Sequence, residues 1–218
     1  MAVVVATRVP IAPAGMLLAE QGESLARLHA LSGHSTHQFE GVYTPLARAL
    51  ASYVQRLPAA EGGPTLLAAR LGQAERVLAR RRGVLLPPGA DPEQVAHEAD
   101  VWTYALFSLA LLRRLARAFA PWTIRLWSAA GQPLGVWQPS TAPRGLATRA
   151  GVAAYSVHAN PEPPRADWTP LVAGALLPPD GLNWLWREPD VQRAWSRALT
   201  GELPAELNPL FVESIESS

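Results

Sequence analysis

The sequence predicts a mainly α-helical bundle with a small β-hairpin region beside it. Apolar residues recur at helical spacing through most of residues 16–120, which is typical of packed amphipathic helices. After residue 121 the pattern changes to short runs rich in aromatic and β-branched residues, separated by glycine and proline. Apolar residues make up 49% of the 218 residues, so the chain can bury a core of this kind.

Three amphipathic helices are expected after an extended lead-in at residues 1–15. They lie at residues 17–31, at residues 39–57 and from the N-cap Thr65 to about Arg82. Each is followed within two residues by a glycine or a proline, and these residue types end helices.

The fourth helix is expected to be the central one. Asp91 is placed to cap its start, Pro92 occupies its first position, and it runs through residues 102–119. Because the helix is apolar on nearly every side between Ala105 and Leu112, it should be buried all round.

The region after Pro121 predicts strands first and helices afterwards. Residues 123–127 and 134–137 form a hairpin around the turn SAAGQP, and residues 153–157 are a candidate third strand. A linker at residues 161–164 follows. The C-terminal helices are expected at residues 169–177 and about 189–199, with a turn at LLPPDG and residues 182–186 leading into the second.

One domain is expected at residues 16–203. It consists of a helical core at about 16–120, and of the hairpin and C-terminal helices at about 121–203. The acidic, proline-punctuated tail at residues 204–218 is expected to be loosely held.

Composition excludes several classes of function. The net charge of +1 gives no overall attraction to nucleic acid or membranes. The chain has no cysteine and all 19 basic residues are arginines, which excludes thiolate, Cys-zinc and lysine chemistry. The longest apolar run, residues 104–112, is too short for a membrane span of about 20 residues, and no signal peptide is visible, so a cytoplasmic location is expected.

Catalytic motifs of defined spacing are missing from the sequence. It contains no GxSxG, GxGxxG or Walker A pattern. His34 and His37 have the i, i+3 spacing of a metal-binding pair, with Glu40 as the candidate third ligand, but a polar loop explains them better. His97, with Glu93 and Asp100 on the same helix, is expected on a solvated face.

Five segments occur in an order that is similar to that of one family. They are YVQRLPAAE (53–61), LLPPGADPE (85–93), WTYALFSLALL (102–112), GQPLGVWQP (131–139) and LLPPDGLNWLWREPDVQRAWSRALTGE (176–202). Over about residues 16–203 the chain thus resembles the N-terminal domain of TraI/MobH-type relaxases of integrative conjugative elements. The resemblance implies a helical variant of the HD-phosphohydrolase fold, in proteins that start DNA transfer.

The chain departs from the family pattern where that pattern holds a metal. Family members carry a histidine cluster, then a ligand histidine in "GGLLrHsLEvA", then a His-Asp pair in "LLHDxGK". Here the cluster is missing after Glu61, Ala69 takes the place of the ligand histidine, and Arg113 and Arg114 replace the pair. At an effective dielectric constant of about 20, an arginine about 4 Å from a divalent cation repels it by several kcal/mol. Neither a metal nor another cofactor is therefore expected, and no inherited catalysis.

Arginines stand on both sides of this altered site in an HD-like bundle. The candidate residues for binding phosphate, a nucleotide or the DNA backbone are Arg70, Arg113, Arg114 and Arg117. A wider basic run on the third helix consists of Arg70, Arg76, Arg80, Arg81 and Arg82. The alternative is that the arginines lie on the surface or pair with carboxylates, for which the candidates are Glu61, Glu75, Glu93 and Glu98.

Two functions from different classes stay open. The favoured one is a catalytically degenerate, relaxase-type HD-like domain that acts as a binding or assembly module in conjugative DNA transfer. Its partners would be DNA, a relaxosome protein or a phosphate-containing ligand. The alternative is a metal-dependent phosphohydrolase or nuclease with a relocated active site. Most of the eight tryptophans should pack the hairpin onto the bundle, but Trp184 or Trp186 could form a protein-docking surface.

Overall fold

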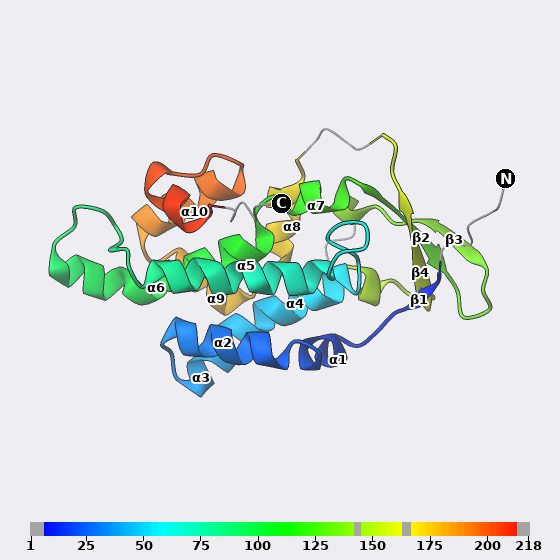
Figure 1. The fold of residues 1–218 in the computed structure, drawn as a ribbon, viewed down its shortest axis with the longest axis horizontal. Coiled ribbons are helices and arrows are strands. Elements are labelled where there is room, and N and C mark those ends of the chain that lie inside the picture. The colour runs from blue at the N-terminus through cyan, green and yellow to red at the C-terminus, as the bar shows by residue number, and fades with distance from the viewer. Residues whose placement is uncertain (1–6, 142–144, 163–166, 213–218) are drawn as a thin grey trace.

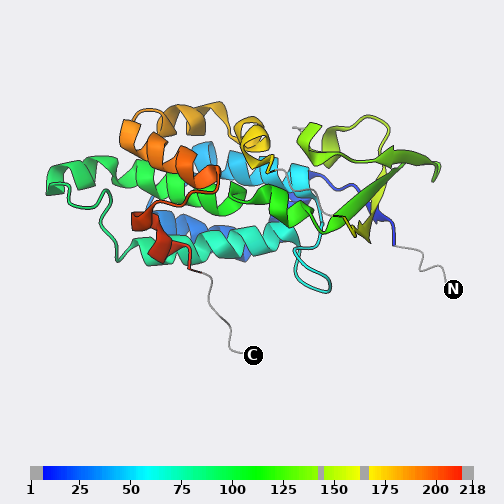
Figure 2. The same ribbon diagram turned by 90° about the horizontal axis from the view of Figure 1, so that it is seen from above.

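A computed structural model describes residues 7–141, 145–162 and 167–212 of the chain. The helices form an elongated bundle, and a four-stranded antiparallel sheet lies at one end of it (Figures 1 and 2). The predicted fold class, a mainly helical bundle with a small β region, is confirmed. The start of the predicted lead-in, the end of the predicted linker and the last residues of the tail lie outside the described residues.

The helices and strands follow one another along the chain as the labels in Figure 1 show. The helices are α1 (Ala14–Ala19), α2 (Gly22–Ser32), α3 (Thr36–Gln38), the π-helix η1 (Phe39–Tyr43), α4 (Thr44–Val54), α5 (Leu66–Arg81), α6 (Pro92–Leu112), α7 (Leu115–Phe119), α8 (Thr169–Leu176), α9 (Pro179–Leu185) and α10 (Pro189–Leu199). The strands are β1 (Val9–Pro10), β2 (Trp122–Trp127), β3 (Pro133–Val136) and β4 (Ala154–Ala159). Short 3-10 turns are η2 (Pro139–Thr141), η3 (Leu146–Thr148) and η4 (Ala205–Leu210).

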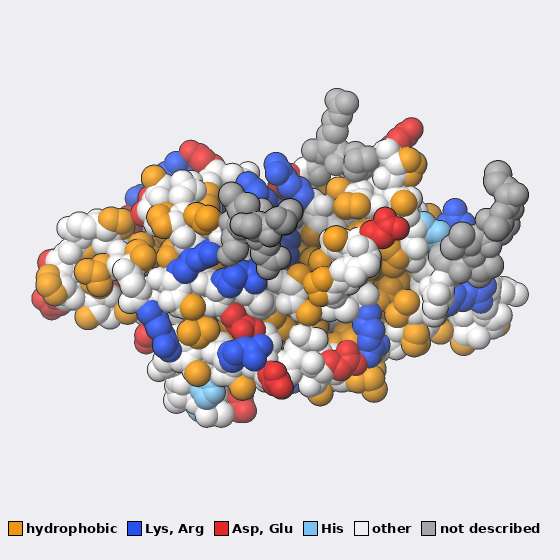
Figure 3. Space-filling model, viewed as in Figure 1, with side chains coloured by type: hydrophobic (Ala, Val, Ile, Leu, Met, Phe, Trp, Pro, Cys, Tyr) orange, Lys and Arg blue, Asp and Glu red, His pale blue; other side chains and the backbone are white. Residues whose placement is uncertain are grey.

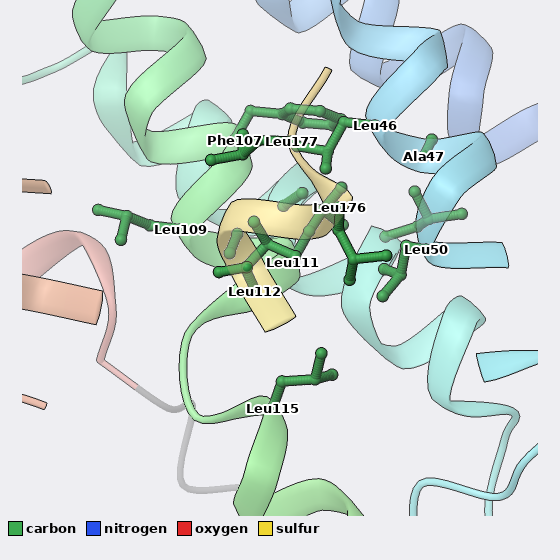
Figure 4. Close-up of a cluster of buried hydrophobic side chains, with 14 of the residues drawn as sticks. Leu46, Ala47, Leu50, Phe107, Leu109, Leu111, Leu112, Leu115, Leu176 and Leu177 are labelled. Atoms are coloured by element: carbon green, nitrogen blue, oxygen red, sulfur yellow. The ribbon is translucent and has the colours of Figure 1, made fainter. Parts of the chain in front are cut away.

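Helix α6 is the axis of the bundle, as its all-round apolar character predicts. Asp91 caps its start by accepting a hydrogen bond from the Gln94 amide (2.8 Å), and no residue from 104 to 112 is more than 1% exposed. The α6 leucines belong to one buried cluster with Leu46 and Leu50 of α4 and Leu176 of α8 (Figure 4). In the described ranges, no helix has both the length and the apolar character that crossing a membrane requires.

The sheet has the strand order β1-β4-β2-β3. The predicted hairpin is confirmed as β2 and β3, the candidate third strand is β4, and the predicted lead-in contributes β1 at the edge. Ile124, Leu126 and Tyr155 are buried on one face of the sheet, and the Tyr155 hydroxyl accepts a hydrogen bond from the Arg56 amide (3.0 Å). The sheet is therefore attached to the end of α4.

Three predicted helices are interrupted in the structure. The helix predicted at residues 17–31 divides into α1 and α2 just before Gly22, a weak helix former. The helix predicted at residues 39–57 starts as the π-helix η1, because Pro45 has no amide hydrogen for the α-helical ladder. It ends at Val54 because Gln55 turns to a positive φ of 52° and binds both backbone groups of Ala12 with its side chain. The helix predicted through Phe119 ends at Leu112, where the candidate site begins.

Two further predictions near the C-terminus are wrong. LLPPDG is not only a turn, because Pro179 occupies the first turn of α9, where a missing amide hydrogen costs nothing. The tail is not loosely held over residues 204–212, because Leu207 and Leu210 are fully buried there. The Arg80 side chain also donates to the carbonyl groups of Leu210 (3.1 Å) and Val212 (2.6 Å).

Candidate anion-binding site

A cavity of about 850 Å³ lies between α5, the α6–α7 junction and residues 203–212. Basic side chains gather over this part of the molecule in the space-filling view (Figure 3). Six arginines line the cavity, namely Arg70, Arg76, Arg80, Arg113, Arg114 and Arg117. Its other described lining residues are apolar or uncharged, and none of them is acidic. We call this hollow the arginine cavity.

One face of α5 supplies half of these arginines. Arg70, Arg76 and Arg80 follow Leu66 and Ala69 at helical spacing, so all of them point to the same side of α5. The two arginines that end the predicted basic run lie outside the cavity lining. Arg82 donates instead to the Ala30 carbonyl (2.8 Å), and Arg81 donates to the Val84 carbonyl.

A sharp turn between α6 and α7 supplies the other half. Arg113 ends α6, and Arg114 adopts the left-handed conformation (φ 56°), which L-residues other than Asn and Asp rarely adopt. The turn directs Arg113, Arg114 and then Arg117 toward the cavity. Arg113 is only 8% exposed and lies 5.8 Å from the centre of the Phe211 ring, so the C-terminal segment covers it.

Arg70 links the two halves of the site. Its guanidinium donates to the carbonyl of Arg113 (2.8 Å), to the carbonyl of Arg114 (3.3 Å) and to Gln73 Oε1 (3.4 Å). Burial, together with the neighbouring charges of Arg113 and Arg114, lowers the pKa of Arg70 to about 10. Arg70 is thus still charged at neutral pH and lies near the positive charges of Arg113 and Arg114.

Two of the four carboxylates suggested as partners of these arginines have other contacts. Glu75 binds Arg27 (2.6 Å) and Ser24 of α2, and Glu98 accepts from Gln94 (2.8 Å) and from the Trp102 indole (3.1 Å). Within the described residues, no ion pair is formed by Arg70, Arg76, Arg114 or Arg117. The surface alternative describes Arg76 and Arg117 correctly, because both side chains are exposed at the rim of the cavity.

The three positions at which the family resemblance implies metal ligands meet in this cavity. Ala69 from α5 and Arg113 and Arg114 from the junction all line it, although 43 residues separate Arg70 from Arg113 in sequence. Among the residues that the structure describes, no group of three His, Cys, Asp or Glu side chains is placed to hold a metal ion.

A second cavity of about 800 Å³ lies beside the N-terminal half of α6, against α9 and the η1 segment. We call it the acidic cavity, since its charged and titratable lining consists of His37, His97, Asp100, Asp180, Arg187 and Glu188. Sequence reasoning missed it because these residues come from three separate segments without a shared motif. His97 is exposed, as predicted, and lies 3.4 Å from Glu188.

His34 and His37 do not converge on a common point. The His34 side chain is only 4% exposed and its Nε2 lies 3.0 Å from the Tyr43 hydroxyl, whereas His37 is exposed at the acidic cavity. Burial lowers the pKa of His34, against the opposing effect of Asp100, whose carboxylate is 3.9 Å away. Among the residues that the structure describes, His34, His37 and Glu40 do not form a group that could hold a metal ion.

The two tryptophans suggested for docking differ in exposure. Trp184 is partly buried and stacks on the Tyr104 ring, with 5.5 Å between the ring centres. Trp186 is 45% exposed and contacts Trp195 with one edge. Only Trp186 has the exposure that a docking residue needs.

Fold and site together define a helical domain built around a cationic hollow. Residues 9–212 match the family model TraI_2, which is described as "Putative helicase". Because the match covers nearly the whole chain, the chain belongs to this TraI family, and the predicted relation to TraI proteins is confirmed. No curated protein matches the chain.

Proposed function

We propose that this chain is a binding module of conjugative DNA transfer, and that its arginine cavity binds a phosphate-bearing ligand. The observation that carries the proposal is the arrangement of six arginines from α5 and the α6–α7 junction around one cavity, whose described lining has no carboxylate. A guanidinium presents a planar fork of donors that matches two phosphate oxygens at once.

Electrostatic repulsion supports an anionic ligand. Burial, and after it the nearby charges of Arg113 and Arg114, lower the pKa of Arg70, so the three positive charges at this place cost free energy. The carbonyl groups of Arg113 and Arg114 accept hydrogen bonds from Arg70 but do not cancel its charge. A bound phosphate would reduce the repulsion between these arginines, and this reduction would make its binding free energy more favourable.

The same residues support binding over hydrolysis. Ala69, Arg113 and Arg114 line the cavity where the resemblance to HD-type domains implies metal ligands. Arginine has no lone pair to offer a cation and keeps its charge in proteins, so these side chains suit an anion.

Membership of the TraI family supports a role in DNA transfer, but not a helicase motor in this chain. The sequence contains no Walker A motif and no lysine, whereas a P-loop motor uses a lysine at the phosphates of its nucleotide. We therefore assign the phosphate contacts to arginines of the bundle.

Calorimetric titration with pyrophosphate and with a short single-stranded oligonucleotide tests the proposal. The wild-type chain should bind pyrophosphate, and Arg114→Gly should weaken binding about tenfold, since a charged hydrogen-bonding contact contributes about 1.5–3 kcal/mol. Glycine also suits the left-handed backbone at this position. Arg193→Gln is the matched control, because Arg193 pairs with Asp190 outside the cavity. No binding by the wild-type chain, or equal binding by Arg114→Gly, contradicts the proposal.

A turnover assay separates this function from the alternative of a relocated active site. The purified chain is incubated with manganese and with phosphodiester or nucleotide substrates, and phosphate release is measured. Turnover that survives in Arg114→Gly would favour the enzymatic alternative.

A further inference from the structure

We infer that Arg70 is a positioning residue of the arginine cavity: its guanidinium fixes the Arg113–Arg114 turn and does not itself bind the anion. This inference rests on the proposed anion-binding function. The sequence alone grouped Arg70 with Arg113, Arg114 and Arg117 as equivalent candidate ligands. The structure sets Arg70 apart, because its terminal nitrogens donate to two backbone carbonyl groups and to Gln73.

The contacts of Arg70 show what it holds. The Nη1 atom donates to the Arg113 carbonyl (2.8 Å) and to Gln73 Oε1 (3.4 Å), while Nη2 donates to the Arg114 carbonyl (3.3 Å). The last carbonyl groups of a helix lack partners inside it, and a cation at this end also interacts favourably with the helix dipole. Arg70 thus acts as a side-chain cap for the end of α6, supplied by the neighbouring helix.

The turn needs such a contact because its backbone is unfavourable. Arg114 has a φ of 56°, and this left-handed conformation costs free energy for an arginine. In the left-handed state, the Arg114 carbonyl accepts from the amides of Arg117 (3.1 Å) and Ala118 (3.4 Å), and so begins α7. The Arg70 fork joins the carbonyl groups of the two peptide links that flank the Arg114 Cα, which fixes the direction in which the Arg114 side chain leaves the backbone.

Helix α7 also has an anchor that does not depend on Arg70. The Ala116 amide donates to the Thr169 hydroxyl (3.0 Å), and Leu115 is fully buried. Loss of the Arg70 fork should therefore loosen the turn without unfolding α7. This separation makes the role of Arg70 measurable apart from global stability.

Two substitutions distinguish positioning from ligand binding. Arg70→Gln removes both the charge and the fork. Arg70→Lys keeps the charge, but its single ammonium group ends one bond short of the terminal guanidinium nitrogens and cannot reproduce the two-pronged contact. If Arg70 positions the turn, both variants should lose pyrophosphate affinity by about tenfold, which corresponds to one charged hydrogen-bond contact. If Arg70 binds the anion through its charge, Arg70→Lys should keep most of the wild-type affinity.

The experiment combines calorimetry with pyrophosphate, hydrogen exchange without ligand, and urea unfolding of the wild-type chain and both variants. We expect the amides of Arg117 and Ala118 to exchange faster in both variants, while Arg193→Gln behaves as the wild type. Wild-type affinity in Arg70→Lys, or unchanged exchange at these two amides, overturns the inference alone. A lowered urea midpoint with unchanged pyrophosphate affinity also overturns it, because Arg70 would then be merely structural. If the wild-type chain binds no pyrophosphate, the proposed function fails and this inference fails with it.

Discussion

The acidic cavity lies beside the N-terminal half of α6 and the arginine cavity lies at its C-terminal end, and the two differ in the partners of their charged side chains. In the acidic cavity and just behind it, carboxylates face histidines: His97 lies 3.4 Å from Glu188, and His34 lies 3.9 Å from Asp100. In the arginine cavity, the described contacts of Arg70 are with the backbone carbonyls of Arg113 and Arg114 and with Gln73. A carbonyl satisfies a donor but leaves the charge in place. Arg70 therefore keeps its positive charge beside Arg113 and Arg114, whereas a histidine beside a carboxylate adds a compensating charge only when it is protonated.

The largest effect is expected from a substitution in α9, which should disturb the packing beside the acidic cavity and leave the arginine cavity unchanged. A Cβ added at Gly181 in α9 would lie 1.9 Å from the buried Tyr104 hydroxyl, and the rigid ring cannot move away cheaply. Gly181→Ala should lower the free energy of unfolding by about 3 kcal/mol in urea titrations. Its pyrophosphate affinity should stay at the wild-type value.

Gly174→Ala in α8 is the control, because nothing lies within 4 Å of its added Cβ. Alanine is the better helix former, so this variant should be about 0.5–1 kcal/mol more stable than the wild type. Equal stabilities of the two alanine variants would contradict the packing of α9 against Tyr104.

The next effect separates backbone strain from charge in the arginine cavity. At Arg114, which has a φ of 56°, glycine relieves the left-handed strain and alanine does not. Arg114→Gly should exceed Arg114→Ala by about 1 kcal/mol in unfolding free energy, although both lose the same charge. Pyrophosphate affinity should fall in both variants. Equal stability would show that the turn is not strained, and unequal affinity would show that backbone geometry contributes to binding.

A smaller, pH-dependent effect belongs to the acidic side. Burial lowers the pKa of His34 in the folded state, with Asp100, Tyr43 and His29 as its polar neighbours. The neutral form is favoured in the folded chain, so stability is complete above the unfolded pKa of about 6.5 and decreases as the pH falls through the lowered pKa.

Urea unfolding at pH 7.5 and pH 5.5 measures this dependence. The unfolding free energy of His34→Gln should fall less between pH 7.5 and pH 5.5 than that of the wild type. The variant of the exposed residue, His37→Gln, should show the same fall as the wild type. A wild-type-like decrease in His34→Gln would assign the effect to other groups.

The smallest effect concerns repulsion at the rim of the arginine cavity. Arg117 is exposed and lines the cavity with five other arginines. Arg117→Gln should raise the unfolding free energy of the ligand-free chain by no more than about 0.5 kcal/mol, since exposed charges interact weakly. The gain should disappear in high salt, which screens the repulsion. A gain that persists there would have another cause.

Helical periodicity predicted the bundle because it reports directly which face of each helix is buried. The buried α6, the caps at Thr65 and Asp91, and the hairpin all follow from local residue patterns. The breaks at Gln55 and Arg114 could not be predicted, because long-range hydrogen bonds to Ala12 and from Arg70 stabilise their positive φ angles. The packing of residues 204–212 against the bundle was missed for the same reason, since Leu207 and Leu210 are buried by helices distant in sequence.

The site could be predicted only in part. The family pattern brought Ala69, Arg113 and Arg114 together correctly, but it could not show that Arg70 turns to the backbone. Arg76 belonged only to the wider basic run, although its spacing from Ala69 and Arg80 places it on the same helix face. Phe211 could not be assigned at all, because its place beside Arg113 depends on the packing of the tail.

The most direct test of the central claim is a crystallographic soak with tungstate, a heavy analogue of phosphate that anomalous scattering locates without ambiguity. We expect tungstate in the arginine cavity, in hydrogen-bond contact with the guanidinium of Arg114 and not with the Arg70 donors that bind backbone. The same soak of Arg114→Gly crystals should show reduced occupancy there. An arginine cavity without tungstate, in crystals that bind the anion elsewhere on the molecule, would contradict the account.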